Sequence, residues 1–240
     1  MTDQIVAIIA ICAILILVGT ALGLTDRKNF SPGWLAVATA LVFANDAMLT
    51  RVYGLIPDLL PDSDWNWQGK LMALALSLGV AALGMFGWRR SGLTLRQYPG
   101  SLRPAAFAFA AYVLFFLVIA LAFDAGDATA ETVAFQLTMP GLEEEIFYRG
   151  ILLLALNEAF RGRIRLLGIG WGWGALLSSM VFGLAHAFSY SAGEGFALDP
   201  IYLALTAIPS LLAVWLRERT GSLLLPITAH NLGNALPLML

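Results

Sequence analysis

The sequence predicts an all-α membrane protein, a polytopic bundle of about eight transmembrane helices. Of its 240 residues, 59% are hydrophobic and 12% are charged, and the mean hydropathy is +0.79. These values lie outside the range of soluble globular domains. A transmembrane helix needs about 20 mostly apolar residues, and we interpret eight segments as meeting that standard.

The predicted spans follow one another along the whole chain. The first begins after an acidic residue, Asp3, and lacks a convincing cleavage site, so we interpret it as a retained helix and not as a signal peptide. Pro140 and Gly141 interrupt the fifth, which indicates that its spanning part starts just before Glu143. The eight segments lie near 5–23, 34–56, 70–88, 104–123, 133–157, 166–188, 200–216 and 222–240.

We expect two parts of about four spans each, residues 1–130 and residues 131–240. The most linker-like stretches are the acidic loop 57–69, the arginine-rich segment 89–103 and the glycine-containing loop 189–199. The net charge of −2 gives no sign of a nucleic-acid partner, so the expected surroundings are a lipid bilayer.

Basic residues are distributed unequally between the two sides of the predicted bundle. The poorer side has Arg51 and Lys70. The richer side has Arg27, Lys28, Arg89, Arg90, Arg96, Arg103, Arg161, Arg163, Arg165, Arg217 and Arg219. The acids of the poorer side are Asp3, Asp58, Asp62, Asp64, Asp124, Asp127, Glu131, Glu194 and Asp199. The positive-inside rule therefore predicts an integral protein of the cell (inner or plasma) membrane with both termini non-cytoplasmic.

The stretch EEEIFYRG, residues 143–150, places charges between apolar segments, where each unpaired charge is costly. Positions four apart share a helix face, so Glu145 and Arg149 are predicted to pair. Glu144 points elsewhere and remains available to a group on another helix. We expect Glu143 to face the outer interface.

The chain has two histidines, and both lie inside predicted spans. His186 ends the stretch FGLAH, and His230 opens HNLGN, with Asn234 on its own face four residues later. A lone intramembrane histidine is usually a packing or helix-bridging group. Two of them beside buried carboxylates indicate a shared polar site, where a carboxylate paired with an imidazole takes a proton from water. An imidazole and a carboxamide are suitable donors to the oxyanion that forms.

EEIFYRG, FGLAH and HNLGN, in this order, resemble the three motifs of the CAAX protease and bacteriocin-processing (CPBP, or Abi) family. Its members are glutamic-type intramembrane endopeptidases related to the CAAX prenyl protease. The resemblance covers roughly residues 131–240 and implies a CAAX-prenyl-protease-like core. It assigns no role to Glu143. The roles it implies are water activation by Glu144 with His186, an oxyanion site of His230 with Asn234, and support of the first motif by Glu145 and Arg149.

The resemblance implies an endopeptidase that processes a membrane-associated protein or peptide, for example at a C-terminal tail or sorting signal. A proton-coupled transporter and a non-catalytic bacteriocin-immunity or scaffold protein are the alternatives, although no inverted repeat indicates a transporter. We expect no cofactor, with zinc as a minority possibility, because the chain has no HExxH motif or cysteine cluster. For Asp46, we favour a pair with Arg51 or a bridge to another helix over a contact with the site or the substrate.

Overall fold

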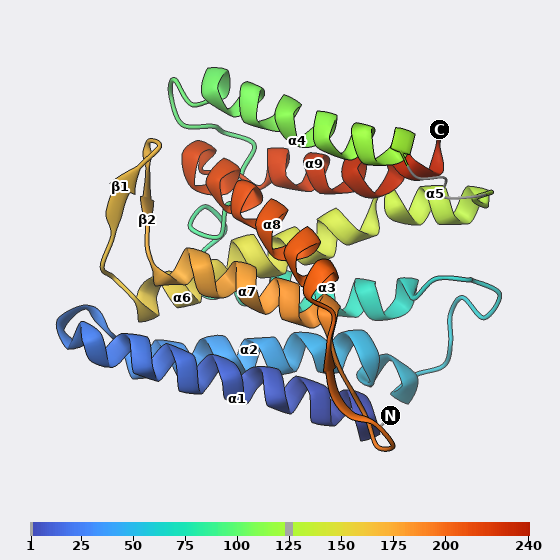
Figure 1. The fold of residues 1–240 in the computed structure, drawn as a ribbon, viewed down its shortest axis with the longest axis horizontal. Coiled ribbons are helices and arrows are strands. Elements are labelled where there is room, and N and C mark those ends of the chain that lie inside the picture. Colours follow the sequence, from blue (N-terminus) through green and yellow to red (C-terminus); the bar gives the residue numbers. More distant parts are fainter. Residues whose placement is uncertain (1, 123–126) are drawn as a thin grey trace. The chain divides into compact units, whose positions relative to one another are not determined.

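The computed structural model describes residues 2–122 and 127–240, which form two compact and mainly helical units (Figure 1). Unit 1 consists of Met1–Ala44 and Leu152–Val214, and unit 2 consists of Asn45–Ile151 and Trp215–Leu240. The all-α class is confirmed, with two short β-hairpins in addition. Asp124, expected among the acids of the poorer side, and residue 123, expected to end a span, lie outside the described residues.

Unit 1 is built around α7 (Trp173–Ala187), which packs against α1 (Thr2–Thr25) and α6 (Leu153–Ala159). It also contains most of α2 (Pro32–Thr50) and of α8 (Pro200–Thr220), and the short helix η1 (Arg27–Asn29). Gly174 lets α7 approach α6 closely, because a Cβ there would overlap the Asn157 side chain. The apolar centre of this packing consists of Leu153, Ala175 and Val214, with Trp171 against it.

Two antiparallel hairpins flank α7 in the chain, and therefore lie at its opposite ends. β1 (Ile164–Leu166) and β2 (Ile169–Trp171) precede it, and β3 (Phe188–Ser191) and β4 (Gly195–Leu198) follow it. The expectation that 166–188 is helical throughout is therefore wrong for its first residues. Leu167 and Gly168 both have positive φ, +53° and +80°, which matches a two-residue hairpin turn and stops a helix.

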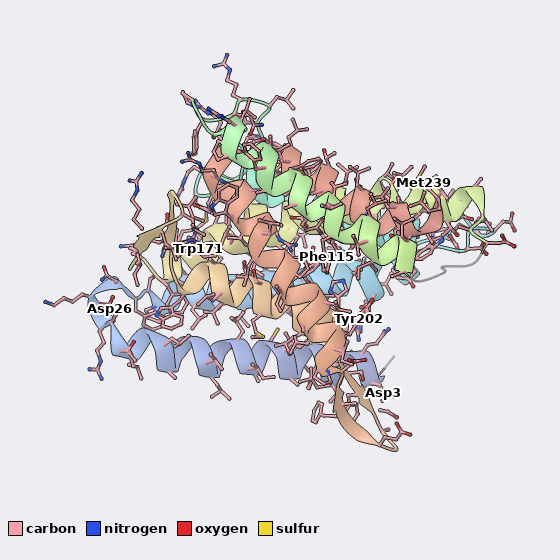
Figure 2. All side chains as sticks on the ribbon, turned by 45° about the horizontal axis from the view of Figure 1, so that its top comes forward. Asp3, Asp26, Phe115, Trp171, Tyr202 and Met239 are labelled. Atoms are coloured by element: carbon pink, nitrogen blue, oxygen red, sulfur yellow. The ribbon has the colours of Figure 1, made fainter. Side chains whose placement is uncertain are left out.

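Charged residues in unit 1 gather at the ends of its helices. Figure 2 shows Asp3 and Asp26 at opposite ends of α1. The basic segment after α1 adjoins the basic segment before β1, since the Arg161 amide donates to the Asn29 carbonyl at 2.8 Å. Both basic segments belong to the side that the sequence predicts to be richer in arginine and lysine, and the direction of the helices in the membrane stays a prediction.

Unit 2 contains a layer in which α4 (Leu102–Ala122) lies beside α9 (Leu224–Ala235) and η4 (Leu236–Leu238), as both views show (Figures 1 and 2). Gly233 allows this contact, because a Cβ at that position would lie 3.1 Å from the Phe116 ring. The other elements are η2 (Val52–Leu55), α3 (Trp67–Ala82), α5 (Ala130–Gln136) and η3 (Gly141–Leu152). All of η3 except its last residue belongs to this unit.

Within the part of the chain that the structure describes, four helices are long and apolar enough to cross a membrane: α1, α2, α4 and α8. Together with the family described below, they make the chain an integral membrane protein. The other predicted spans also contain helix, but α3, α7 and α9 have 16, 15 and 12 residues. The count of about eight spans stays a prediction for these shorter elements. The predicted interruption of the fifth segment is confirmed, because α5 ends at Gln136 and η3 begins at Gly141.

Candidate active site

The glutamate-rich stretch lies on η3, a π-helix of 12 residues. In a π-helix, the backbone hydrogen bonds join residues five apart, a rare geometry that is frequent at functional sites. Glu143, Glu144, Glu145 and Arg149 are all buried, with at most 8% of any residue exposed. Four charged side chains within seven residues of one buried helix require partners from other helices.

Glu145 is shared by a cation of its own helix and a histidine of α9. Its Oε1 lies 3.0 Å from Nη1 of Arg149, which confirms the predicted pair. The same oxygen lies 2.7 Å from Nδ1 of His230. Because an ionised carboxylate only accepts, Nδ1 is the donor, and this bond fixes the imidazole's orientation and leaves Nε2 to face the rest of the site.

Glu144 meets groups from two other helices, as expected of a side chain that points away from Arg149. Its Oε1 accepts a hydrogen bond from Nζ of Lys70 on α3 at 2.6 Å. Its Oε2 lies 3.7 Å from Nε2 of His230, which is too long for a direct hydrogen bond. The carboxylate that the family resemblance assigns to water activation thus has one oxygen held by an ammonium and the other beside an imidazole.

Glu143 does not face an interface, and that expectation is wrong. Its side chain is fully buried, and its two oxygens accept from Lys70 Nζ at 2.7 Å and from Asn45 Nδ2 at 3.0 Å. The cost of burying a carboxylate is offset by these two bonds, one of them charged. Nearby, the pairing of Asp46 with Arg51 is confirmed at 3.2 Å.

Amide side chains of α9 form hydrogen bonds with the start of η3 and with the segment before it. Asn231, which is buried, accepts from the Gly141 amide at 2.7 Å and donates to the Thr138 carbonyl at 3.3 Å. It replaces helical hydrogen bonds that the break at Pro140 removes. Asn234 donates through Nδ2 to the Gln136 side-chain oxygen at 3.1 Å.

His186 belongs to unit 1, at the last turn of α7. It is exposed on its own unit, its ring lies 4.5 Å from that of Phe182, and Nδ1 donates to the Phe182 carbonyl at 2.8 Å. In the neutral ring, Nε2 is then the basic nitrogen. The structure therefore brings Glu144, Glu145, Arg149 and His230 together in unit 2 and places His186 separately in unit 1. The predicted pairing of Glu144 with His186 stays a prediction.

The charges of the unit 2 cluster nearly balance. Three carboxylates, Glu143 to Glu145, face two permanent partners, Lys70 and Arg149, so the five side chains sum to −1 when all are ionised. The two cations offset much of the cost of burying the three carboxylates.

Sequence reasoning missed Lys70, Asn45 and Asn231. The signal for Lys70 was present, since it is one of two lysines in the chain and stands at the start of an apolar segment, where a cation is costly. Asn45 and Asn231 offered no comparable signal. Across residues 2–122 and 127–240, no group of three or more His, Cys, Asp or Glu side chains could hold a metal ion.

The comparisons with known proteins identify a family. A model of the type II CAAX prenyl endopeptidase Rce1-like family matches residues 113–236, just over half of the chain, and the match includes the Glu144, His186 and His230 motifs. No curated protein and no solved structure matches significantly. This match assigns the chain to the class of membrane hydrolases. The chain belongs to the Rce1-like family of CAAX-type membrane endopeptidases, which confirms the resemblance.

Proposed function

We propose that this protein is an endopeptidase that hydrolyses a peptide bond in a membrane-associated protein or peptide, with Glu144 as the general base and without a metal. The observation that carries the proposal is the placement of the Glu144 carboxylate beside Nε2 of His230, 3.7 Å away, in a buried cluster of the family's matched region. An acid or base held next to an imidazole in a dry site is suited to moving protons during hydrolysis.

In the proposed reaction, the Glu144 carboxylate takes a proton from a water molecule, and the water oxygen attacks the carbonyl carbon of the substrate. A tetrahedral oxyanion forms and accepts hydrogen bonds from the protein. When it collapses, the carbon–nitrogen bond breaks, and the proton passes to the leaving amine. Water is consumed, and no electron carrier is needed.

His230 and Asn234 are the proposed oxyanion donors. The bond from Nδ1 of His230 to Glu145 supports this role, because it fixes the orientation of the ring and directs Nε2 toward Glu144. Asn234 uses one amide hydrogen on Gln136 and retains a second for the substrate. His186 is proposed to orient the water through Nε2, as the family resemblance implies.

A metal-free site is supported by what surrounds the carboxylates. Glu143 and Glu144 each give an oxygen to Lys70, and Glu145 gives one to Arg149 and to His230. These are partners that stabilise carboxylates without a metal ion. Chelation is therefore expected to leave cleavage unchanged, and loss of cleavage that added zinc restores would overturn this part of the proposal.

The proposed substrate segment is the C-terminal tail of an exported protein with an apolar stretch. Lys70 lies near the start of α3, next to the acidic loop whose Asp64 amide hydrogen-bonds to Glu131. If the acidic side faces outward, as the positive-inside rule predicts, the cluster opens toward exported substrates. A cytoplasmic site would instead favour prenylated CAAX tails.

The test uses the purified full chain in proteoliposomes with two fluorogenic peptides. One ends in a farnesylated CAAX sequence, and the other ends in an unprenylated apolar helix with a basic tail. We expect cleavage of the second peptide by the wild type and none by Glu144→Ala, with both proteins folded and inserted. Cleavage by Glu144→Ala at the wild-type rate would refute the assignment of the base, and preference for the farnesylated peptide would refute the substrate class.

A further inference from the structure

One ammonium in unit 2 is divided between two neighbouring carboxylates. Nζ of Lys70 lies 2.6 Å from Oε1 of Glu144 and 2.7 Å from Oε2 of Glu143, and 11% of its side chain is exposed. Both contacts are hydrogen bonds. One carboxylate is enough to neutralise the Lys70 ammonium. The second carboxylate therefore gives the three side chains a net negative charge.

Glu143 is held too firmly to act on a substrate directly. It is fully buried, and Asn45 from the last part of α2 donates to the oxygen that Lys70 does not contact, at 3.0 Å. Both carboxylate oxygens therefore have donors from other helices. Any influence of Glu143 on the reaction must pass through Lys70 or through its own charge.

Taking Glu144 to be the general base of the proposed function, we infer that Lys70 and Glu143 are positioning residues that set the protonation state of Glu144. The Lys70 ammonium favours the ionised carboxylate of Glu144 by Coulomb attraction. Glu143 opposes it, because it competes for the ammonium and adds a like charge. As a result, Glu144 binds a proton more tightly than a carboxylate that has only a cation beside it. It binds the proton less tightly than a carboxylate that has only an anion beside it.

Several other titratable or charged groups of unit 2 also act on Glu144. The imidazole of His230 on α9 approaches it most closely, at 3.7 Å. The others within electrostatic reach are Tyr112 on α4 and Tyr148, Glu145 and Arg149 on η3. Because substitutions of Lys70 or Glu143 leave all of these in place, the difference between two such variants isolates the contribution of the pair.

The two residues have opposite expected effects. Lys70→Met removes the positive charge, so the protonated form of Glu144 becomes more favourable. The pH at which Glu144 is half protonated then rises by about 1 to 3 pH units. Glu143→Gln removes a negative charge and leaves the ammonium to Glu144, so that pH falls. The double variant removes both charges and returns the value toward that of the wild type.

The experiment is an infrared titration of the full chain in lipid nanodiscs, which follows the carboxylic-acid band against pH. The Glu144→Gln variant identifies the band of Glu144 by its loss. This measurement needs no substrate, so it does not depend on hydrolysis. Arg51→Met serves as the matched control, because it removes a cation that pairs with Asp46 and is expected to move the band little.

Opposite shifts for Lys70→Met and Glu143→Gln, with a near-return in the double variant, are the expected result. Shifts in the same direction, or no shift in either variant, overturn the inference. If Lys70→Met does not fold, Glu143→Gln and the charge-balanced double variant still decide the matter. Failure of this inference can be distinguished from failure of the proposed function. Normal cleavage by Glu144→Gln would refute Glu144 as the base, whatever shifts the infrared titration shows.

Discussion

The two units of this protein differ in the polar groups that they bury. The buried polar residues of unit 1 are uncharged: Thr39, Ser178, Ser179 and Ser210. The buried charged residues of the part of the chain that the structure describes all belong to unit 2: Glu143, Glu144, Glu145, Arg149 and Arg217. Hydroxyl groups can be satisfied within their own helix, as Thr39 is by the Leu35 carbonyl at 2.9 Å. Charges cannot.

The difference shows where this apolar chain accepts an energetic cost. In unit 2, the partners of the buried carboxylates come from positions far away in the sequence, such as Lys70 for Glu144 and His230 for Glu145. A network of this kind is costly to fold and stabilises little compared with apolar packing. Its presence in one unit indicates that function, and not stability, accounts for it.

The largest expected effect is on the stability of unit 2. Arg149→Met leaves Glu145 without its cation in a buried site, so the free energy of unfolding should fall by about 3–5 kcal/mol. Unfolding by SDS titration in mixed micelles measures this change. The double variant with Glu145→Gln should recover much of the loss, and a fully stable Arg149→Met would show that the ion pair is not what holds η3.

The next effect concerns activity. Glu145→Gln removes the carboxylate that orients the His230 ring, so kcat should fall by about 10²- to 10⁴-fold while KM changes little. Steady-state kinetics on the peptide that the wild type cleaves separates the two constants. Glu158→Gln on α6 of unit 1 is the matched control, since that carboxylate pairs with an exposed Arg161 at 3.8 Å. Equal losses of kcat in Glu145→Gln and Glu158→Gln would contradict the view that the buried carboxylates of unit 2 have a special role in activity.

A smaller effect is expected from two glycines within unit 2. A Cβ at Gly141 would overlap Asn231 and lie 2.6 Å from the Ile227 carbonyl, so Gly141→Ala should cost about 1–3 kcal/mol. Gly79 on α3 has open space, and Gly79→Ala should stabilise by about 0.5–1 kcal/mol. The same SDS titration compares them, and a destabilised Gly79→Ala would argue against the described packing.

The smallest effect belongs to unit 1. The Ser178 hydroxyl is buried and donates to the Ala175 carbonyl of its own helix at 3.4 Å. Ser178→Ala removes the donor, and the carbonyl keeps its place in the helix, so stability should change by no more than about 1 kcal/mol. Thermal unfolding measures it. A loss as large as that of Arg149→Met would contradict the view that unit 1 buries polar groups cheaply.

The sequence predicts best what depends on neighbours in the chain. The helical class, the interruption at Pro140 and the pairs Glu145–Arg149 and Asp46–Arg51 all follow from composition or from spacings of four or five residues. The burial of Glu143 and the sharing of Lys70 depend on which helices become neighbours, which one sequence does not specify. The hairpin at 164–171 was missed because its strands have three residues each, too few for a recognisable alternation.

The helix spacing gave an incomplete set of partners. It identified Glu145 as a partner of Arg149, whereas in the structure the same carboxylate oxygen also contacts His230. Motif patterns name residues by position along a helix, and the contacts between helices follow from packing. For this reason, the candidate site residues could be named from the sequence, but their hydrogen bonds could not.

The central claim is that the buried carboxylate cluster of unit 2 is the hydrolytic centre, and it is tested most directly by the cleavage rates of Glu144→Gln and Glu158→Gln in the same proteoliposomes. We predict that the first variant, in unit 2, loses about 10²- to 10⁴-fold in turnover while folding normally, and that the second, in unit 1, cleaves like the wild type. A Glu144→Gln protein that cleaves at the wild-type rate would contradict the account.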